Sequence, residues 1–213
     1  MVRNSVRGTV TGVLAAVSVA VTGCTSSAPD DGGNGERTAP KLRTAAKSAA
    51  KGGSIGGPGS DCALPVTFDL AASWKPAAVQ AVEDDALSGL AEQGPVTLVC
   101  EIDAKPAGNI GFLRVWTGDR TGSTPRQVLK AFLAADPNAG RATYTDLKAG
   151  SLTAAEVGYT VSNELLDEPK EERAFAVSTP SGPVVVHLGG LDSQEQKEML
   201  PAYELAKKSV RLG

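Results

Sequence analysis

Cys24 is the residue whose position most clearly indicates a chemical reaction. Two basic residues, Arg3 and Arg7, stand near the start of the chain, and no charged residue occurs between Gly8 and Cys24. The apolar centre of this stretch, residues 10–21, is shorter than the roughly 20 apolar residues that a membrane-spanning helix requires. A basic start, a short apolar middle and a small-residue exit are the parts of a secretory signal peptide. The thiol of Cys24 stands at that exit, where it can act as a nucleophile.

The four residues Val21-Thr22-Gly23-Cys24 resemble the lipobox of bacterial lipoproteins, in which an aliphatic residue and two small or short residues precede a cysteine. The resemblance implies transfer of a diacylglyceryl group to the Cys24 sulfur and signal cleavage between Gly23 and Cys24. Two acyl chains anchor a protein stably, whereas one binds reversibly. We therefore expect a lipid-anchored protein on the extracytoplasmic face of the cell membrane. The alternatives are a non-lipidated signal peptide with an incidental cysteine and an uncleaved short anchor.

The other two cysteines, Cys62 and Cys100, form an even pair if Cys24 is acylated. Exported proteins meet an oxidising compartment, where such a pair is expected to form a disulfide. Two reduced buried thiols are the alternative.

The single histidine, His187, limits the catalytic and metal chemistry that the chain can carry. A zinc site built from several histidines or from a cysteine cluster is excluded by counting, and we expect no metal and no cofactor. His187 lies in the apolar run 184–188, which predicts a strand, and no Gly-x-Ser-x-Gly nucleophile motif accompanies it. We expect a structural or edge-facing histidine; a role as the base for a serine is the alternative.

Two pairs of neighbouring carboxylates, Asp84-Asp85 and Glu171-Glu172, are the other candidates for acid–base chemistry. Side chains of sequence neighbours point apart, and both pairs lie in polar runs, so we expect solvated surface. The stretch 164–172 is predicted to be a solvated loop or hairpin tip. No catalytic residue is predicted.

The charge of the chain excludes one class of partner. From Asp61 onward, 14 basic residues stand against 21 acidic ones, a net charge of −7. Nucleic-acid binding needs a basic footprint, so that class is excluded. Electrostatic adsorption to anionic lipid is disfavoured for the same reason, which leaves the lipid on Cys24 as the expected anchor.

Three regions follow from the composition. Residues 1–23 are predicted to be the signal peptide, residues 24–60 the lipidated cysteine with a disordered linker, and residues 61–213 a single folded domain. The linker is rich in Gly, Ser, Ala, Pro and Lys and has few large apolar residues. It cannot bury enough apolar surface to offset its ordering entropy.

Periodicity and turn residues predict the elements of the domain. In 96–103, the side chains of Val96, Leu98, Cys100 and Ile102 are predicted to share one face. Thr124-Pro125 marks a helix start. We expect strands over 66–70, 96–103, 110–117, 142–148, 154–162, 173–179 and 183–188, helices over 124–134 and from 192 to about 210, and a loosely helical segment over 76–91.

Hairpin-connected strands with two amphipathic helices indicate an α+β fold, an antiparallel sheet covered by helices. Local strings within residues 66–74, 109–115, 124–134 and 200–206, in this order, resemble actinobacterial lipoproteins of the LpqN type. That resemblance implies the PsbP-like α/β/α sandwich, and the acidic segment 79–92 departs from it. PsbP-like proteins are mostly non-enzymatic accessory or binding proteins, and no functional residue transfers to this chain.

Three functions follow as hypotheses. The first is a non-enzymatic accessory module that docks an envelope protein, with its ligand-binding residues and oligomeric state undetermined. The second is a carrier of an apolar or lipid-like small ligand, with a pocket between sheet and helix near Trp116. Trp74 and Trp116 could line such a pocket, but core or rim positions are favoured for both. An envelope enzyme is the third, and it is disfavoured because no nucleophile–base pair is visible.

Overall fold

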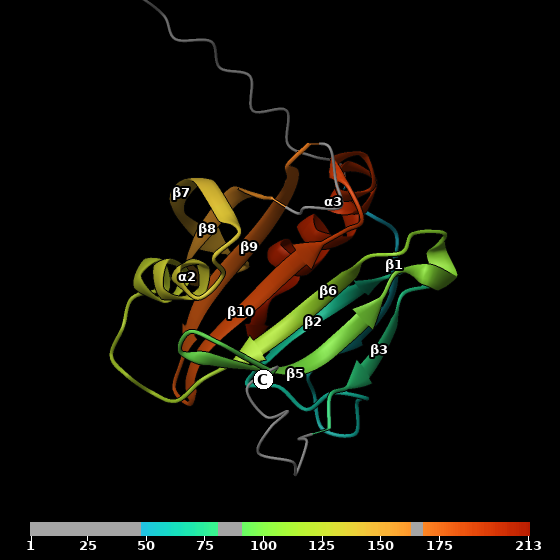
Figure 1. The fold of residues 1–213 in the computed structure, drawn as a ribbon. Helices are drawn as coiled ribbons and strands as arrows, with labels where there is room; N and C mark the ends of the chain where they lie inside the picture. Colours follow the sequence, from blue (N-terminus) through green and yellow to red (C-terminus); the bar gives the residue numbers. More distant parts are fainter. Residues whose placement is uncertain (1–47, 81–90, 163–167) are drawn as a thin grey trace, which may run out of the picture. The chain divides into compact units, whose positions relative to one another are not determined.

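Two antiparallel sheets and two helices make up the part of the chain that the computed structural model describes, residues 48–80, 91–162 and 168–213. The predictions for Cys24, for Asp84-Asp85 and for residues 81–90 and 163–167 lie outside these residues. The larger sheet has the strand order β3-β5-β6-β10-β9-β8-β7, with β4 paired to β5, and the smaller sheet has the order β1-β2-β11. Figure 1 shows the arrangement. The strands and helices are β1 (Lys51–Ile55), β2 (Val66–Ala71), β3 (Lys75–Ala78), β4 (Glu92–Gln93), β5 (Val96–Asp103), the 3₁₀ turn η2 (Lys105–Ala107), β6 (Phe112–Thr117), α2 (Pro125–Ala134), β7 (Ala139–Ala149), β8 (Leu152–Val161), β9 (Lys170–Thr179), β10 (Gly182–Gly189), α3 (Ser193–Ser209) and β11 (Arg211–Leu212).

The larger sheet separates two hydrophobic cores. On one face, α2 packs its apolar stripe of Val128, Leu129, Phe132 and Leu133 against β8, β9 and β10. On the opposite face, α3 and the smaller sheet bury the second core, in which Tyr203 of α3 is fully buried. The predicted α+β class, an antiparallel sheet with helices on its faces, is confirmed. We call these faces the α2 face and the α3 face.

The α2 helix begins as the sequence predicts. The Thr124 side chain accepts a hydrogen bond from the Gln127 backbone N–H, and the Gln127 side chain accepts one from the Thr124 N–H. This reciprocal pair is a capping box, and it follows directly from the Thr-Pro-x-Gln sequence. The α3 helix begins at the Asp192 cap and continues through Pro201.

One predicted face is wrong. A register shift between Leu98 and Cys100 in the pairing of β5 with β6 divides the strand. As a result Val96 and Leu98 belong to the core on the α2 face, whereas Cys100 and Ile102 belong to the core on the α3 face. A bulge adds one residue and reverses the alternation of side chains beyond it, so period-2 reasoning fails at that point.

The start of the predicted helical segment is also wrong. Lys75–Ala78 is the strand β3, paired antiparallel with Cys100–Asp103 at the edge of the larger sheet. Pro76 is compatible with an edge strand, where no partner requires a backbone N–H on the open side.

The folded part begins earlier than the predicted boundary at Asp61. Strand β1, Lys51–Ile55, pairs with β2, and Ile55 is only 1% exposed. The segment 51–55 is therefore not linker. The sequence did not predict this strand because its two glycines and its serine are typical of a flexible segment. Ile55 is its one large apolar residue.

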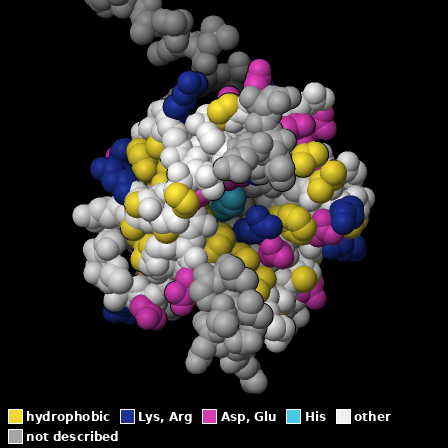
Figure 2. Space-filling model, in the orientation of Figure 1, with side chains coloured by type: hydrophobic (Ala, Val, Ile, Leu, Met, Phe, Trp, Pro, Cys, Tyr) yellow, Lys and Arg dark blue, Asp and Glu magenta, His cyan; other side chains and the backbone are white. Residues whose placement is uncertain are grey.

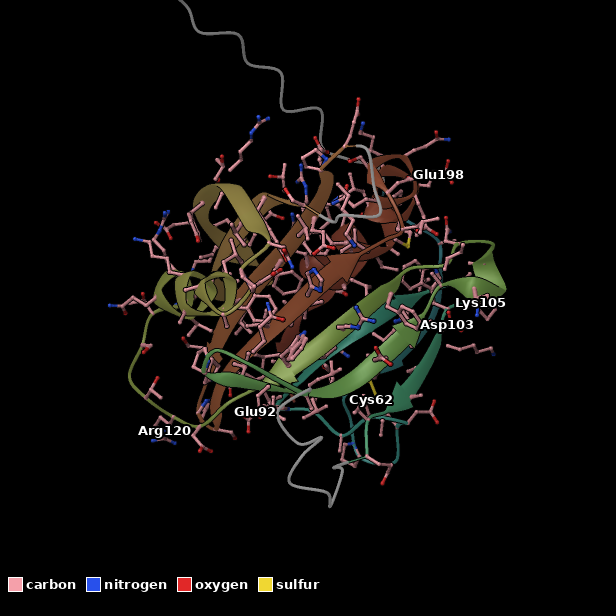
Figure 3. The ribbon with its side chains drawn as sticks, in the orientation of Figure 1. Cys62, Glu92, Asp103, Lys105, Arg120 and Glu198 are labelled. Atoms are coloured by element: carbon pink, nitrogen blue, oxygen red, sulfur yellow. A yellow bond between two sulfur atoms is a disulfide. The ribbon has the colours of Figure 1, made fainter. Side chains whose placement is uncertain are left out.

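A disulfide joins Cys62, in the loop before β2, to Cys100 on β5 (Figure 3). It links the smaller sheet covalently to the larger one. For a sequence separation of 38 residues, the chain-entropy model assigns about 4 kcal/mol of stabilisation to such a bond.

Candidate functional site

Four polar side chains meet on the α2 face, where β8, β9 and β10 lie side by side. Tyr159 of β8 pairs in register with Glu172 of β9, and His187 comes from β10. Lys170 precedes Glu172 by two residues on β9. Tyr159, Glu172 and His187 are each less than 10% exposed. We call these four residues the Glu172 cluster.

The Glu172 carboxylate is the centre of this cluster. Its Oε2 lies 2.8 Å from His187 Nε2 and accepts a 3.0 Å hydrogen bond from the Tyr159 hydroxyl. Its Oε1 lies 2.7 Å from Lys170 Nζ, which also donates to the Gly190 carbonyl. Three donors therefore converge on one buried carboxylate, which is the arrangement that a buried charge requires.

The electrostatics of the cluster favour the ionised carboxylate. Burial alone raises the pKa of Glu172, but attraction and hydrogen bonding from His187 and Lys170 outweigh it and lower the pKa from 4.5 to about 2. Burial raises the pKa of Tyr159 well above its ordinary value, and the nearby Glu172 charge raises it further. Tyr159 is consequently a neutral donor and not a nucleophile.

The polar groups of the cluster are bonded to one another. His187 Nε2 faces Glu172, and the hydroxyl beside it, Tyr159, already donates to the same carboxylate. Within residues 48–80, 91–162 and 168–213, no serine, threonine or cysteine side chain is hydrogen-bonded to His187. The Glu172 cluster therefore links three neighbouring strands through one buried carboxylate.

The Glu172 cluster lies at the border of the part of the sheet that α2 covers. Phe132 of α2 contacts His187 at a ring separation of 6.0 Å, and Trp116 packs edge-on against Phe132 at 5.4 Å. Trp116 and Trp74 are both buried, in different cores. The Trp116 Nε1 has no hydrogen-bond partner among the described residues. Trp116 is thus a core residue at this position.

The α2 helix reaches β5 and β6 at the end where Val96 and Trp116 pack against it, and beyond His187 no described helix lies over the other end of these two strands (Figure 1). Arg114 of β6 is opposite His187 in the register, forms a 2.7 Å ion pair with Glu101 of β5, and stacks over the Phe112 ring at 5.0 Å. Figure 2 shows the one histidine of the chain in view near the centre of this face, with basic, acidic and hydrophobic side chains around it. This half of the face is a mixed polar and aromatic surface.

Two large apolar side chains are exposed at one end of the larger sheet. Ile110, before β6, is 57% exposed and Leu191, before α3, is 53% exposed. Their backbone N–H groups both donate to the carboxylate of Glu195 in the first turn of α3. Glu195 also accepts a 3.3 Å bond from the Gly111 N–H. One carboxylate therefore accepts hydrogen bonds from both loops and holds the backbones of Ile110 and Leu191 close together.

Two hollows have different chemistry. A groove of about 340 Å³ between α2 and β7 has an apolar part that includes Leu133, Ala139 and Tyr144. A second hollow of about 240 Å³ crosses β7, β8 and β9, and Arg141 and Arg173 contribute to it. Neither includes Trp116, where the sequence predicted a pocket.

The structure separates the predicted site residues. Glu171 is exposed as expected, but Glu172 is buried in β9, so the predicted solvated surface is wrong for Glu172. It is buried because strand alternation turns it toward Tyr159 and His187. His187 is buried and lies 2.8 Å from the Glu172 carboxylate, and its structural role stays a prediction. Sequence reasoning missed the link between Glu172 and His187, although Glu172, Ala174 and Ala176 alternate as one strand face.

Two negative findings apply to the described residues alone. In residues 48–80, 91–162 and 168–213, no group of three or more His, Cys, Asp or Glu side chains is placed to hold a metal ion. In the same residues, no helix is both long and apolar enough to cross a membrane.

Comparison with known proteins identifies a family and shows similarity to solved structures. The model of a family described as "Uncharacterised lipoprotein" matches residues 33–210. No curated protein matches the chain. The solution structure of cyanobacterial PsbP (CyanoP) from Synechocystis sp. PCC 6803 is similar to this structure, with 11% sequence identity, 70% of this chain and 87% of that chain covered, and a TM-score of 0.49.

Proposed function

The chain belongs to the family of uncharacterised lipoproteins whose model spans residues 33–210, and from that premise we propose a non-enzymatic accessory module that docks an envelope protein. A diacylglyceryl group on Cys24 holds the module on the extracytoplasmic face of the cell membrane. Residues 1–23 are the cleaved signal peptide, and the residues between Cys24 and residue 47 form the tether.

The displayed pair of Ile110 and Leu191 carries this proposal. Large apolar side chains that are more than half exposed and lie near one another mark interaction surfaces more often than scattered ones do. Glu195 fixes both loops through backbone hydrogen bonds, so little conformational entropy is lost when a partner covers them. The uncovered strip of Phe112 and Arg114 on the α2 face is of the aromatic and arginine composition that is enriched at interfaces.

The Glu172 cluster, in which the polar groups bond to one another, supports docking over catalysis. Its carboxylate is saturated by His187, Tyr159 and Lys170, so the histidine of this chain is engaged in structure. An acid–base enzyme needs a group that can exchange protons with a substrate.

Replacement of Cys24 by Ala tests the anchor. We expect the variant to leave the membrane fraction because the acyl chains are the proposed attachment. The measurement is fractionation of cells followed by immunodetection, with the wild-type chain as reference. Retention of the variant in the membrane fraction would contradict lipid anchoring.

Site-specific photocrosslinking tests the docking surface. A photoreactive residue is placed at position 110, at position 191 or, as the matched control, at position 212, where Leu212 is 47% exposed on β11 of the other sheet. We expect the same discrete protein adduct from positions 110 and 191 in intact cells, and none from 212. Replacement of Ile110 by Asp should abolish the adduct from position 191. Identical adducts from all three positions contradict the proposed surface.

The groove between α2 and β7 favours a second function, the carriage of an apolar ligand. Its volume of about 340 Å³ lies in the usual range of ligand sites, and Leu133 and Ala139 give it an apolar lining. An environment-sensitive fatty-acid probe should then gain fluorescence with the wild-type chain and lose it after replacement of Ala139 by Glu. No gain with the wild-type chain excludes this function.

A further inference from the structure

We propose that the hollow across β7, β8 and β9 on the α3 face binds a small ligand through an oxyanion, a carboxylate or a phosphate group. Three residues in register build its floor: Thr143 of β7 is paired with Gly158 of β8, which is paired with Arg173 of β9. The next row, Thr160 and Glu171, continues the same face. The hollow measures about 240 Å³.

Gly158 lines the hollow and has no side chain to fill it. It stands in the interior of β8, where a glycine weakens a strand and often marks a close approach by a ligand or another backbone. An added Cβ at Gly158 would meet no atom within 4 Å, and its φ is not in the left-handed region. Neither local packing nor backbone conformation therefore requires a glycine here. The missing side chain leaves space between Thr143 and Arg173.

Arg173 supplies the positive charge. It is partly buried, and its guanidinium forms no ion pair or hydrogen bond with any residue of 48–80, 91–162 or 168–213. Guanidinium groups match the geometry of carboxylates and phosphates with two parallel hydrogen bonds. Arg141, in the bulge of β7, adds a second guanidinium at the rim. A partly buried guanidinium that forms no ion pair with any described residue is the feature that an oxyanion completes.

The carboxylate nearest along the strand is engaged elsewhere. Glu156 precedes Gly158 by two residues on the same face of β8, and its Oε1 accepts hydrogen bonds from the Tyr203 hydroxyl at 2.9 Å and from Lys207 Nζ at 2.7 Å. The Glu156 carboxylate is therefore bonded to α3, and it forms no ion pair with Arg173.

The remaining lining residues restrict the ligand. The hydroxyls of Thr143 and Thr160 can donate to an oxyanion, whereas the exposed Glu171 carboxylate repels a second negative charge. The hollow therefore favours a ligand with one oxyanion and a hydroxyl or amino group that can donate to Glu171. A free phosphate, a small organic acid and a lipid headgroup all offer this oxyanion.

Calorimetric titration of the full chain in detergent, at constant ionic strength, tests the site. The probes are inorganic phosphate, lactate and glycerol 3-phosphate, which separate a free phosphate, a hydroxylated carboxylate and a headgroup. We expect saturable binding of at least one probe, and the strongest probe identifies the source. No saturable binding of any probe at millimolar concentration overturns the proposal.

Three variants test whether the probe binds in the hollow. Replacement of Arg173 by Gln should weaken binding by at least about tenfold, the effect of about 1.4 kcal/mol. Replacement of Arg120 by Gln is the matched control, because Arg120 contacts the Pro180 carbonyl at the opposite end of β9 (Figure 3). Replacement of Gly158 by Val fills the hollow without a change of charge, so this variant should lose binding while the protein remains folded by circular dichroism. Equal affinities for the Arg173 and Arg120 variants, or an unchanged affinity of the Gly158→Val variant, overturn the proposal.

Discussion

Glu172 and Arg173 are neighbours on β9, yet their side chains lie on opposite faces of the larger sheet in opposite electrostatic situations. On the α2 face, Glu172 is buried and accepts three donors. On the α3 face, Arg173 has no ion-pair or hydrogen-bond partner among the described residues and borders a hollow. Their partners in β8, Tyr159 and Gly158, repeat the contrast, since one fills its site and the other leaves space. The buried carboxylate is thus surrounded by partners, whereas the guanidinium on the other face forms no ion pair or hydrogen bond with a described residue and borders a hollow.

The largest expected effect on the free energy of unfolding comes from removal of the buried Glu172 carboxylate. Replacement of Glu172 by Ala leaves Lys170 and His187 without their carboxylate in a buried site. The free energy of unfolding should fall by about 3–5 kcal/mol, as when one partner of a buried ion pair is removed. Urea unfolding followed by circular dichroism measures this change.

Glu171 is the matched control for Glu172. It is adjacent in sequence but exposed, so its replacement by Ala should change the free energy of unfolding by no more than about 0.5 kcal/mol. Equal losses for the two variants would show that Glu172 is no more important to stability than a surface carboxylate.

Acid should weaken the same cluster. The folded protein lowers the pKa of Glu172 from 4.5 to about 2, so the carboxylate stabilises the fold fully above pH 4.5. This contribution is lost as the pH falls through about 2, and it amounts to about 3 kcal/mol. The measurement is the urea midpoint between pH 5 and pH 2 for the wild-type chain and for Glu172 replaced by Gln. The variant should lose less stability over this window; parallel curves would refute the assigned role of the carboxylate.

The sequence predicted most of the fold because its signals are local. The alternation of Val66, Phe68 and Leu70 predicts β2, and the Thr124-Pro125 cap predicts the start of α2. A hairpin such as β9–β10 is defined by two short apolar runs around Pro180-Ser181-Gly182. Each of these features depends on residues within a few positions of one another.

The site depends on pairings between distant residues. Tyr159 and His187 are 28 positions apart, and their meeting at Glu172 requires the strand order β8-β9-β10, which no local pattern contains. Glu172 was further hidden by the charged residues before it, which resemble a loop. The bulge at Leu98 likewise leaves no mark in composition, so the exchange of faces along β5 was not predictable.

The smallest expected effect on the free energy of unfolding concerns Gly158, which borders the hollow beside Arg173. Replacement of Gly158 by Ala adds a Cβ that meets no atom within 4 Å, at a position where the backbone is extended. Because the alanine restricts the unfolded chain, the free energy of unfolding should rise by about 0.4–1 kcal/mol.

Gly182 at the start of β10 provides the opposite control. Its φ is +141°, and an added Cβ would lie 1.9 Å from the Gly118 carbonyl oxygen. Replacement of Gly182 by Ala should therefore destabilise the protein, by more than the Gly158 variant stabilises it. If urea unfolding shows that both variants are destabilised, packing requires the glycine at 158. The space between Thr143 and Arg173 would then be a consequence of that packing, and the argument that it is kept open for a ligand would fail.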